Sequence, residues 1–274
     1  RRSPPTLKEV FDQGNATHVI TFGDELGAGK LRDARGVAVS PDSKIWVADR
    51  SKARLQVYSM EGVFLHQFPQ NGLGHPSKKP LDVSIDKDGH LWVLVNGYHT
   101  SPYSVVQFSR GGHLKASFGL PDSHTVPRGW PLGMAVDLRN DHVFVAWSFR
   151  GYGGGVQAFN PADGKLQWDV GRQQRMLMPM NVAVNGTGNI FVPDYYTDYI
   201  YVYGKDGQYV SKFGGPRGSG GRLKHPQGIC VDSSGHILVA DSNNHRVVTY
   251  TDQGVYVRHI ATPAGEYPVG VAVG

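Results

Sequence analysis

Residues 226–260 read PQGICVDSSGHILVADSNNHRVVTYTDQGVYVRHI, and they predict four short strands. Each predicted strand is an apolar or alternating run bounded by Gly, Asn, Asp or Ser. The four strands are Gly228–Val231, Ile237–Asp241, Arg246–Tyr250 and Tyr256–Ile260. A four-stranded unit of this size cannot bury both of its faces alone, so we expect neighbouring units of the same kind.

The first-strand motif of this unit recurs along the whole chain. Its copies begin at residues 36, 82, 133, 181, 228 and 270, with start-to-start spacings of 46, 51, 48, 47 and 42 residues. A period in the forties with four strands per repeat is typical of a propeller blade. The sequence therefore predicts an all-β fold, a six-bladed β-propeller.

The predicted blades account for residues 1–274 as one propeller domain. We expect the outer two strands of the sixth blade at Leu7–Phe11 and His18–Phe22, and its first strand at Val269–Gly274, so that pairing of the N- and C-terminal strands closes the ring. Its second strand must come from Arg1–Pro5 or from residues beyond Gly274. Since the chain begins at Arg1 and not at methionine, we expect it to be part of a longer protein. The expected blades are 34–68, 80–119, 131–171, 179–214, 226–260, and 268–274 plus 6–22.

The repeated pattern resembles the NHL repeat. It reads Pro-x-Gly-Ile/Val-x-Val, then Asp/Asn-x-x-Gly-x-Ile-x-Val-Ala-Asp, then Asn-His-Arg-Val, and it is fullest at 226–260 and clear at 34–68. NHL propellers occur most often at the carboxyl end of tripartite-motif (TRIM-NHL) proteins. The resemblance implies either RNA binding with post-transcriptional repression of messages, or a platform for protein–protein interaction that recruits substrates to a ubiquitin ligase.

The composition excludes several classes of protein. The single cysteine, Cys230, rules out a disulfide within the chain and a zinc-binding RING within these residues, and we interpret it as a small core residue. No apolar run approaches the ~20 residues of a membrane span, and no signal peptide is visible. We expect a cytoplasmic protein without a membrane partner.

Positive charge is concentrated in one set of predicted loops. In a propeller, the loops between the second and third strands share a face with the loops that join successive blades. These segments contain sixteen Lys and Arg and nine Asp and Glu, whereas the rest of the chain contains twelve and fourteen. A cationic face suits a polyanionic partner, although a solvated basic face can also arise by chance.

The same loops are rich in aromatic side chains, which predicts single-stranded or hairpin RNA as the partner. Cations neutralise phosphates while bases stack on exposed rings, and Arg is favoured over Lys for its planar fork. The predicted RNA-binding residues are Arg50, Lys52, Arg54, Tyr98, His99, Arg128, Arg150, Tyr152, Arg172, Arg175, Tyr195, Tyr196, Arg217, Arg222, Lys224, Asn243 and His245.

Structural interpretations compete with several of these assignments. Trp147 ends a predicted strand and is expected to pack between blades. Asn243 and His245 could read a base edge or shape their turn. We expect a repeated structural pair for the Asp residues that end second strands and the Arg residues that precede third strands, which are Asp49, Asp194 and Asp241 with Arg54 and Arg246.

The common enzyme motifs are missing from the sequence. It has no His-Glu-x-x-His, no Cys-x-x-Cys and no Gly-x-Ser-x-Gly. Peptide-amidating lyases are similar in fold but carry zinc-binding His before their inner strands. The corresponding residues here are Arg35, Leu81, Leu132, Met180, Gln227 and Val269.

These observations predict a propeller with no catalytic residue, no metal and no cofactor. Asp82 and Asn181 offer two oxygen ligands, far fewer than the ~6–8 that calcium takes. A non-enzymatic RNA-binding module is the first hypothesis and a protein-interaction platform the second. A lyase-like or calcium-dependent enzyme is the third.

Overall fold

A computed structural model describes most of the chain and divides it into two compact units. Unit 1 is Arg1–Ser117 with Gly274, and unit 2 is Phe118–Val273. Of residues 6–12, 15–19 and 261 only the backbone is described. Residues outside the description are 1–5, 13–14, 24–26, 28, 69–72, 74–77, 97–102, 121–128, 138, 150–152, 217–220 and 263–264.

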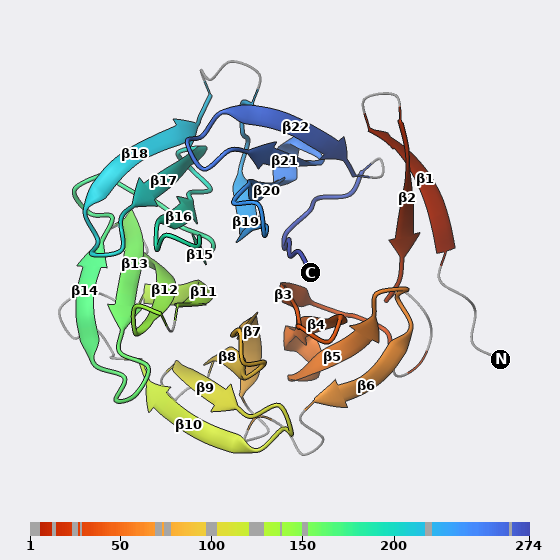
Figure 1. The fold of residues 1–274 in the computed structure, drawn as a ribbon, viewed down its shortest axis with the longest axis horizontal. Helices are drawn as coiled ribbons and strands as arrows, with labels where there is room; N and C mark the ends of the chain where they lie inside the picture. Colours follow the sequence, from red (N-terminus) through yellow and green to blue (C-terminus); the bar gives the residue numbers. More distant parts are fainter. Residues whose placement is uncertain are drawn as a thin grey trace. The chain divides into compact units, whose positions relative to one another are not determined.

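Unit 1 contains a two-stranded sheet and two antiparallel four-stranded sheets, each with its strands in chain order (Figure 1). The small sheet is β1 (Thr6–Asp12) and β2 (Asn15–Thr21). Blade one is β3 (Ala34–Val39), β4 (Lys44–Asp49), the 3₁₀ helix η1 (Arg50–Lys52), β5 (Arg54–Ser59) and β6 (Phe64–Phe68). Blade two is β7 (Lys79–Ile85), β8 (Leu91–Asn96), β9 (Ser104–Phe108) and β10 (Leu114–Gly119), whose last two residues belong to unit 2.

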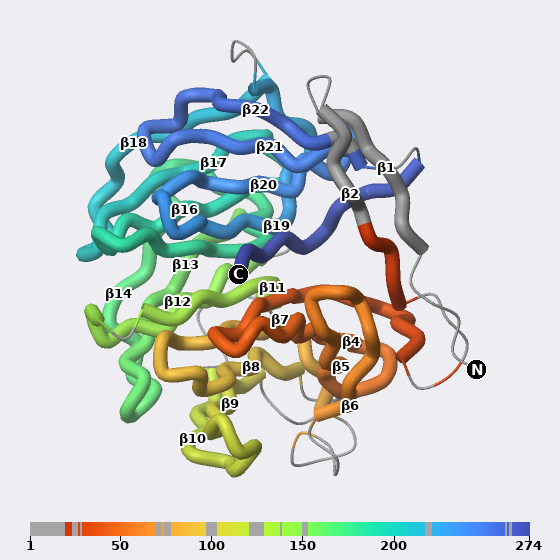
Figure 2. Tube along the Cα trace, turned by 45° about the vertical axis from the view of Figure 1, so that its right-hand side comes forward, coloured from red at the N-terminus to blue at the C-terminus, as the bar shows by residue number. Residues whose placement is uncertain are grey.

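Unit 2 contains three further four-stranded sheets, and Figure 2 shows the strands of the last of them side by side. Blade three is β11 (Gly129–Asp137), β12 (His142–Phe149), β13 (Gly153–Phe159) and β14 (Leu166–Val170). Blade four is β15 (Ala183–Val184), β16 (Ile190–Pro193), β17 (Tyr199–Tyr203) and β18 (Tyr209–Gly214). Blade five is β19 (Pro226–Val231), β20 (Ile237–Asp241), the 3₁₀ helix η2 (Ser242–Asn244), β21 (Arg246–Tyr250) and β22 (Tyr256–Ala261).

The fold is an all-β propeller, but the expectation of six blades is wrong, because five four-stranded blades form. The predicted outer strands are present as β1 and β2, which remain a two-stranded sheet, and residues 269–274 form no strand. A strand needs a hydrogen-bonding neighbour, and no strand among the described residues pairs with residues 269–274; the expected partner Arg1–Pro5 lies outside the description. This segment lies against β19 instead: a Cβ at Gly228 would be 2.6 Å from the carbonyl oxygen of Val269.

Glycines at the start of the inner strands allow successive blades to approach closely. A Cβ at Gly36 in blade one would be 2.7 Å from the Cα of Asp82 in blade two. A Cβ at Gly133 in blade three would be 2.7 Å from the Cα of Asn181 in blade four. The neighbour in each case is backbone, so it cannot swing aside. The recurring glycine of the sequence motif is therefore a packing requirement.

A second recurring contact joins the outer strand of one sheet to the last hairpin of the next. In blade four, Gly207 has a φ of 79°, as the tight hairpin requires. A Cβ there would be 2.9 Å from the indole of Trp168 in blade three, so the ring covers the turn directly. The same contact occurs for Phe22 and Gly62, Phe68 and Gly112, Phe118 and Gly164, and Phe213 and Gly254.

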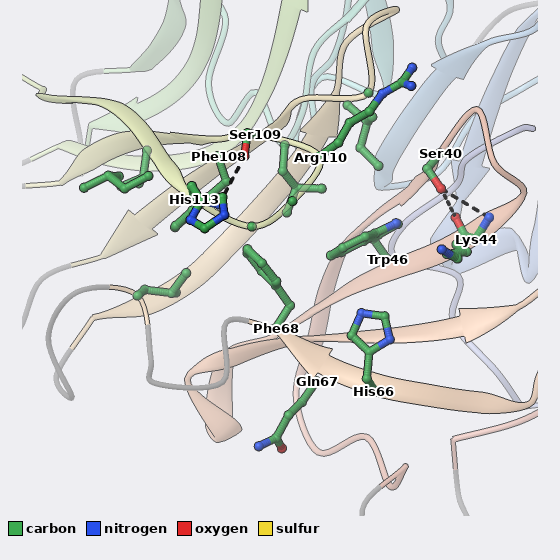
Figure 3. Close-up of a pocket in the computed structure, with 18 of the residues that line it drawn as sticks. Ser40, Lys44, Trp46, His66, Gln67, Phe68, Phe108, Ser109, Arg110 and His113 are labelled. Carbon is green, nitrogen blue, oxygen red and sulfur yellow. Dashed lines mark hydrogen bonds between the residues drawn. The ribbon is translucent and has the colours of Figure 1, made fainter.

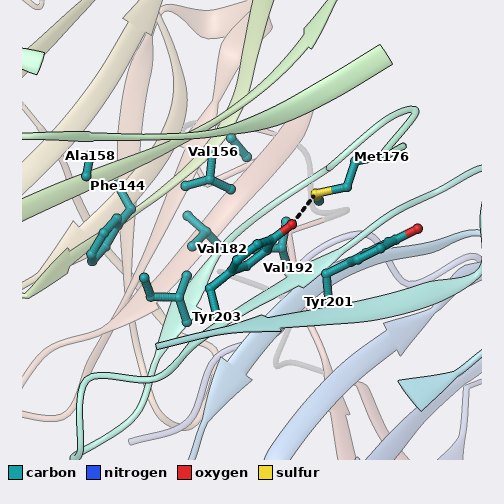
Figure 4. Packing of buried hydrophobic residues seen from close by; sticks show 10 residues of the cluster. Phe144, Val156, Ala158, Met176, Val182, Val192, Tyr201 and Tyr203 are labelled. Carbon is teal, nitrogen blue, oxygen red and sulfur yellow. Dashed lines mark hydrogen bonds between the residues drawn. The ribbon is translucent and has the colours of Figure 1, made fainter. Parts of the chain in front are cut away.

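Apolar side chains fill the space between neighbouring blades. Between blades three and four, Phe144 and Val156 pack against Val182, Val192 and Tyr203 (Figure 4). Comparable clusters lie between blades one and two and between blades four and five. Each fully buried side chain contributes roughly 1.5–3 kcal/mol, so these layers stabilise the fold more than any single polar contact.

We expect the substitution Gly133→Ala to lower the free energy of unfolding by about 1–3 kcal/mol, because its methyl group overlaps the backbone of Asn181. Chemical denaturation followed by circular dichroism measures the change. Gly119→Ala is the matched control, since a Cβ there meets nothing within 4 Å. Equal stability of the two variants would contradict the close approach.

Candidate nucleic-acid interface

A buried aspartate at the end of β16 joins two loops of blade four. The Oδ2 atom of Asp194 accepts hydrogen bonds from the backbone N–H groups of Leu177, at 2.6 Å, and Met178, at 3.1 Å. Its Oδ1 atom accepts from the N–H groups of Tyr196 and Thr197, both at 3.1 Å. The loop before blade four and the loop between β16 and β17 therefore lie at the same end of the sheet.

Blades one and five repeat this arrangement. Asp49 accepts from the backbone N–H groups of Arg32, at 3.1 Å, and Asp33, at 3.2 Å. Asp241 accepts from the N–H of Lys224, at 2.7 Å, and from the Nε of Arg246, also at 2.7 Å. The side chains of all three aspartates are fully buried, which identifies them as structural and not as ligands.

The predicted cations of unit 1 lie close together around Asp49. Burial lowers the pKa of Lys52, and the charges of Arg54, Arg32 and Lys30 lower it further. The Nζ of Lys52 donates to the carbonyl oxygen of Lys30. The Nη1 of Arg50 lies 3.6 Å from the Oδ2 of Asp33, and Arg54 donates to Gln67. Much of this cationic group is thus engaged by the protein itself.

The loops of unit 2 bring several rings together. The rings of Tyr195 and His225 are stacked, with centroids 4.3 Å apart and an interplanar angle of 10°. Tyr196 packs edge-on against Tyr195 at 5.1 Å, and 61% of its surface is exposed. The side-chain amide of Asn243 lies 2.6 Å from the Nδ1 of His225 and holds that ring in place.

His225 itself is fixed by its backbone. Its φ of 51° lies in the left-handed region, and its N–H donates to the Oδ1 of Asp198 at 2.8 Å. That bond ties the loop before blade five to the loop between β16 and β17 in blade four. The stacked pair therefore stands on two loops that are joined by hydrogen bonds.

His245 supports a second pair of rings. Its ring lies 4.4 Å from that of Tyr267, and its Nδ1 lies 2.7 Å from the carbonyl oxygen of Glu266. It also ends η2 with a φ of 52°, a conformation that His adopts more readily than most residues. His245 thus shapes its turn and also presents a ring.

Exposed cations belong to the same loops. Arg172 and Arg175 precede blade four, and Arg222 and Lys224 precede blade five; all four are exposed. We call the combined set the unit 2 loop surface. It consists of Arg172, Arg175, Tyr195, Tyr196, Arg222, Lys224, His225, Asn243, His245 and Tyr267.

Eight of these ten residues were predicted from the sequence, whereas His225 and Tyr267 were not. His225 directly precedes the proline that opens the fullest repeat, and that place is a signal in the sequence that could have identified it. Tyr267 lies in a segment that was predicted only to connect blades. Six predicted residues lie outside the description, namely Tyr98, His99, Arg128, Arg150, Tyr152 and Arg217.

Trp147 and Cys230 are packing residues. Trp147 is 5% exposed and stacks on Phe149 with centroids 6.4 Å apart, as its place at the end of a strand predicts. Burial, with a smaller effect from the charge of Asp232, raises the pKa of the Cys230 thiol to about 12. A thiol with this pKa is almost entirely protonated at neutral pH, and the thiolate is the nucleophile.

We expect Cys230 to react with a disulfide reagent at pH 8 about 10³-fold more slowly in the folded protein than in guanidinium, because a pKa raised from 9.0 to about 12 lowers the thiolate fraction by that factor. The absorbance of the released thiolate measures both rates. A folded-state rate near the unfolded one would show that the thiol is neither buried nor perturbed.

The side-chain oxygens that the sequence offered as calcium ligands accept hydrogen bonds from the backbone. The Oδ1 of Asp82 accepts from the N–H of Val83 at 2.9 Å, and the Oδ1 of Asn181 accepts from the N–H of Val182 at 2.7 Å. Within the described residues, one group of possible metal ligands is close enough together, consisting of Asp86, Asp88 and His90. These residues form the turn between β7 and β8.

No helix in the described ranges is long and apolar enough to cross a membrane.

The comparisons with known proteins agree with this repeat architecture. Residues 223–250 match the NHL repeat. The matched segment covers most of blade five, including η2 and His225. No match to the chain was found among the curated proteins.

Solved structures share the fold at low sequence identity. The chain is 10% identical to a chain of a nidogen/laminin complex, with a TM-score of 0.67, 99% of this chain and 96% of that one covered. It is 14% identical to a streptogramin B lyase, with a TM-score of 0.63 and coverages of 87% and 72%. It is 16% identical to virginiamycin B lyase from Staphylococcus aureus, with a TM-score of 0.61 and coverages of 88% and 75%.

The lyases correct one expectation from the sequence. We expected a propeller without enzymatic activity because the common catalytic motifs are missing. Virginiamycin B lyase and streptogramin B lyase are enzymes, and this chain shares their fold. The architecture therefore does not exclude catalysis, since function resides in particular sites and not in the fold.

Proposed function

We propose that the unit 2 loop surface binds single-stranded or hairpin RNA. The observation that carries the proposal is the stacked, hydrogen-bonded ring pair of Tyr195 and His225 beside the exposed cations Arg222 and Lys224. A ring held in place before the ligand arrives loses little conformational freedom when a base stacks on it. Cations in the same loop neutralise the flanking phosphates.

The charge balance of this surface favours an anionic ligand. The two buried aspartates of these loops, Asp194 and Asp241, accept hydrogen bonds from backbone N–H groups and from Arg246, so their negative charge is already balanced within the fold. Asp198 and Glu266 are the other carboxylates of the described loops around this surface. Four exposed cations, Arg172, Arg175, Arg222 and Lys224, outnumber these two. A positive, ring-bearing surface is what sequence-tolerant single-strand binding requires.

The broader role that we propose follows the resemblance to TRIM-NHL proteins. In that setting the propeller acts in the cytoplasm, within a larger protein, and its RNA binding serves post-transcriptional repression. The NHL repeat at 223–250 supports this setting, because it contains His225, Asn243 and His245 of the loop surface.

A protein-interaction role is the second candidate, with recruitment of substrates to a ubiquitin ligase as its specific form. It is favoured by the similarity to a chain from a nidogen/laminin complex. Exposed apolar side chains at the loop surface fit this role as well, since Leu177 is 47% and Tyr267 59% exposed. A protein partner held by such side chains would remain bound at moderate salt and would tolerate reversal of the nearby charges.

We expect Tyr196→Ala to weaken binding of single-stranded RNA by about 1–3 kcal/mol, the value of one base stacked on an aromatic ring. Fluorescence polarisation with a labelled random-sequence RNA at low salt measures the affinity. Tyr209→Ala is the matched control, because Tyr209 is 43% exposed but starts β18, at the opposite end of the sheet. Flat titrations at low salt would rule out the proposed function.

We expect Lys224→Glu to weaken binding and to reduce the slope of log affinity against log salt by about 1, as loss of one phosphate contact predicts. Lys205→Glu reverses an exposed charge in the hairpin between β17 and β18 and should leave the slope unchanged. Equal slopes for the two variants would place the RNA elsewhere on the protein.

A further inference from the structure

A large cleft in unit 1 lies between blades one and two and uses no residue of the unit 2 loop surface. Its volume is about 1230 Å³. Ligand pockets usually measure about 300–1,000 Å³, so this cleft is ample for a small molecule. The hairpin turns at 40–44, 89 and 109–113 border it, at the end of the sheets opposite Asp49.

The floor of the cleft is apolar and its walls are aromatic. Leu91, Val106 and Phe108 form the floor and are 4%, 3% and 6% exposed. The ring of Phe68 stands edge-on to Phe108 at 5.1 Å and edge-on to Trp46 at 5.6 Å. Figure 3 shows these rings gathered from both blades. Such walls offer a flat ligand both ring edges and ring faces.

The cleft is lined by more cations than carboxylates. Lys44 and Arg110 belong to its hairpin end, as does Asp42, whereas Lys78 precedes β7, whose first residue pairs with Asn96 at the opposite end of the sheet. The Asp42 carboxylate is already satisfied, because the Nζ of Lys44 lies 2.7 Å from its Oδ2 and the Ser40 hydroxyl donates to its Oδ1 at 2.6 Å. Arg110 at the hairpin end, whose Nε donates to the carbonyl oxygen of Asp88, and Lys78 at the other end therefore set the sign of the potential. Aromatic walls alone would suit a cationic ligand, but these two cations would repel it.

One residue of the cleft wall, Trp46, has an indole N–H donor without an acceptor among the described residues. In blade two, the Nε1 of Trp92 donates to the Oδ2 of Asp86 at 3.0 Å. The corresponding positions in blade one are Trp46 and Ser40, and the Nε1 of Trp46 is buried without a hydrogen-bond partner among the described residues. Replacement of the turn aspartate by serine thus leaves this wall less firmly fixed and less negative than its counterpart in blade two.

We propose that this cleft binds a small organic anion whose flat apolar body has two or three rings and carries one carboxylate or sulfonate. The rings stack against Trp46 and Phe68 above the apolar floor. The anionic group lies at the hairpin end of the cleft, facing Arg110. The cleft is a site separate from the proposed RNA-binding surface, and the two proposals stand or fall independently.

Two dyes that share one ring system test the proposal. 8-Anilinonaphthalene-1-sulfonate carries the anion, and N-phenyl-1-naphthylamine has the same rings without it. We expect saturable fluorescence enhancement with the sulfonate, and an affinity about tenfold higher than for the neutral dye. Equal affinities, or the lack of saturable sulfonate binding, would overturn the proposal.

Charge reversals locate the binding site. Arg110→Glu should lower the sulfonate affinity about tenfold and change that of the neutral dye less than about twofold, whereas Lys78→Glu, at the other end of β7, should lower the sulfonate affinity less. Lys205→Glu in unit 2 is the control and should change neither affinity. Sulfonate binding that Arg110→Glu leaves unchanged would show that the dye lies elsewhere.

The variant Ser40→Asp separates loss of the site from loss of the fold. It adds the carboxylate that Asp86 supplies to Trp92 in blade two but loses the hydroxyl that donates to Asp42, so we expect a melting temperature close to that of the unchanged protein together with weaker sulfonate binding. A partly unfolded protein would instead melt at a lower temperature and bind more dye. Stronger sulfonate binding by Ser40→Asp would contradict the assignment.

Discussion

The loops of this propeller depend on the buried aspartate that ends the second strand of blades one, four and five. In blades one and four its two oxygens hold the loop before the blade and the loop within it through backbone N–H groups, at 2.6–3.1 Å in blade four. In blade five it accepts from the backbone N–H of Lys224 and from the side chains of Asn244 and Arg246. A buried carboxylate is tolerated only when such donors surround it. Removal of Asp194 would leave four backbone donors near Tyr195 and Tyr196 without their acceptor, so the positions of the candidate site residues follow from this one bond set.

The sequence was a good guide to the blades and a poor one to the closure of the fold. Ile237–Asp241 and Arg246–Tyr250 were predicted with the bounds that the structure shows, because strong apolar runs end at turn residues there. Residues 269–274 carry the same first-strand motif but form no strand. A sequence motif indicates that a segment is suited to a strand. The strand forms only if a neighbouring strand is present to share its hydrogen bonds.

The candidate site could be predicted from the sequence only in part. Exposure of Tyr196 was predictable, since two adjacent tyrosines in a polar loop cannot both point inward. The stack of Tyr195 on His225 was not, because the residues are thirty positions apart and the hydrogen bonds that fix His225, to Asp198 and Asn243, have no signature in the sequence. The cleft of unit 1 was likewise invisible in the sequence, since its walls come from two different blades.

The ring that covers each hairpin glycine comes from the sheet that precedes it in the chain, as Phe68 does for Gly112 and Trp168 for Gly207. During synthesis, the aromatic residue of each such contact therefore leaves the ribosome before the hairpin glycine that it covers. Domains are generally synthesised and folded from the amino terminus onward. Blades two and four can then condense on a surface that already exists, and the polarity of this contact suits vectorial folding during translation.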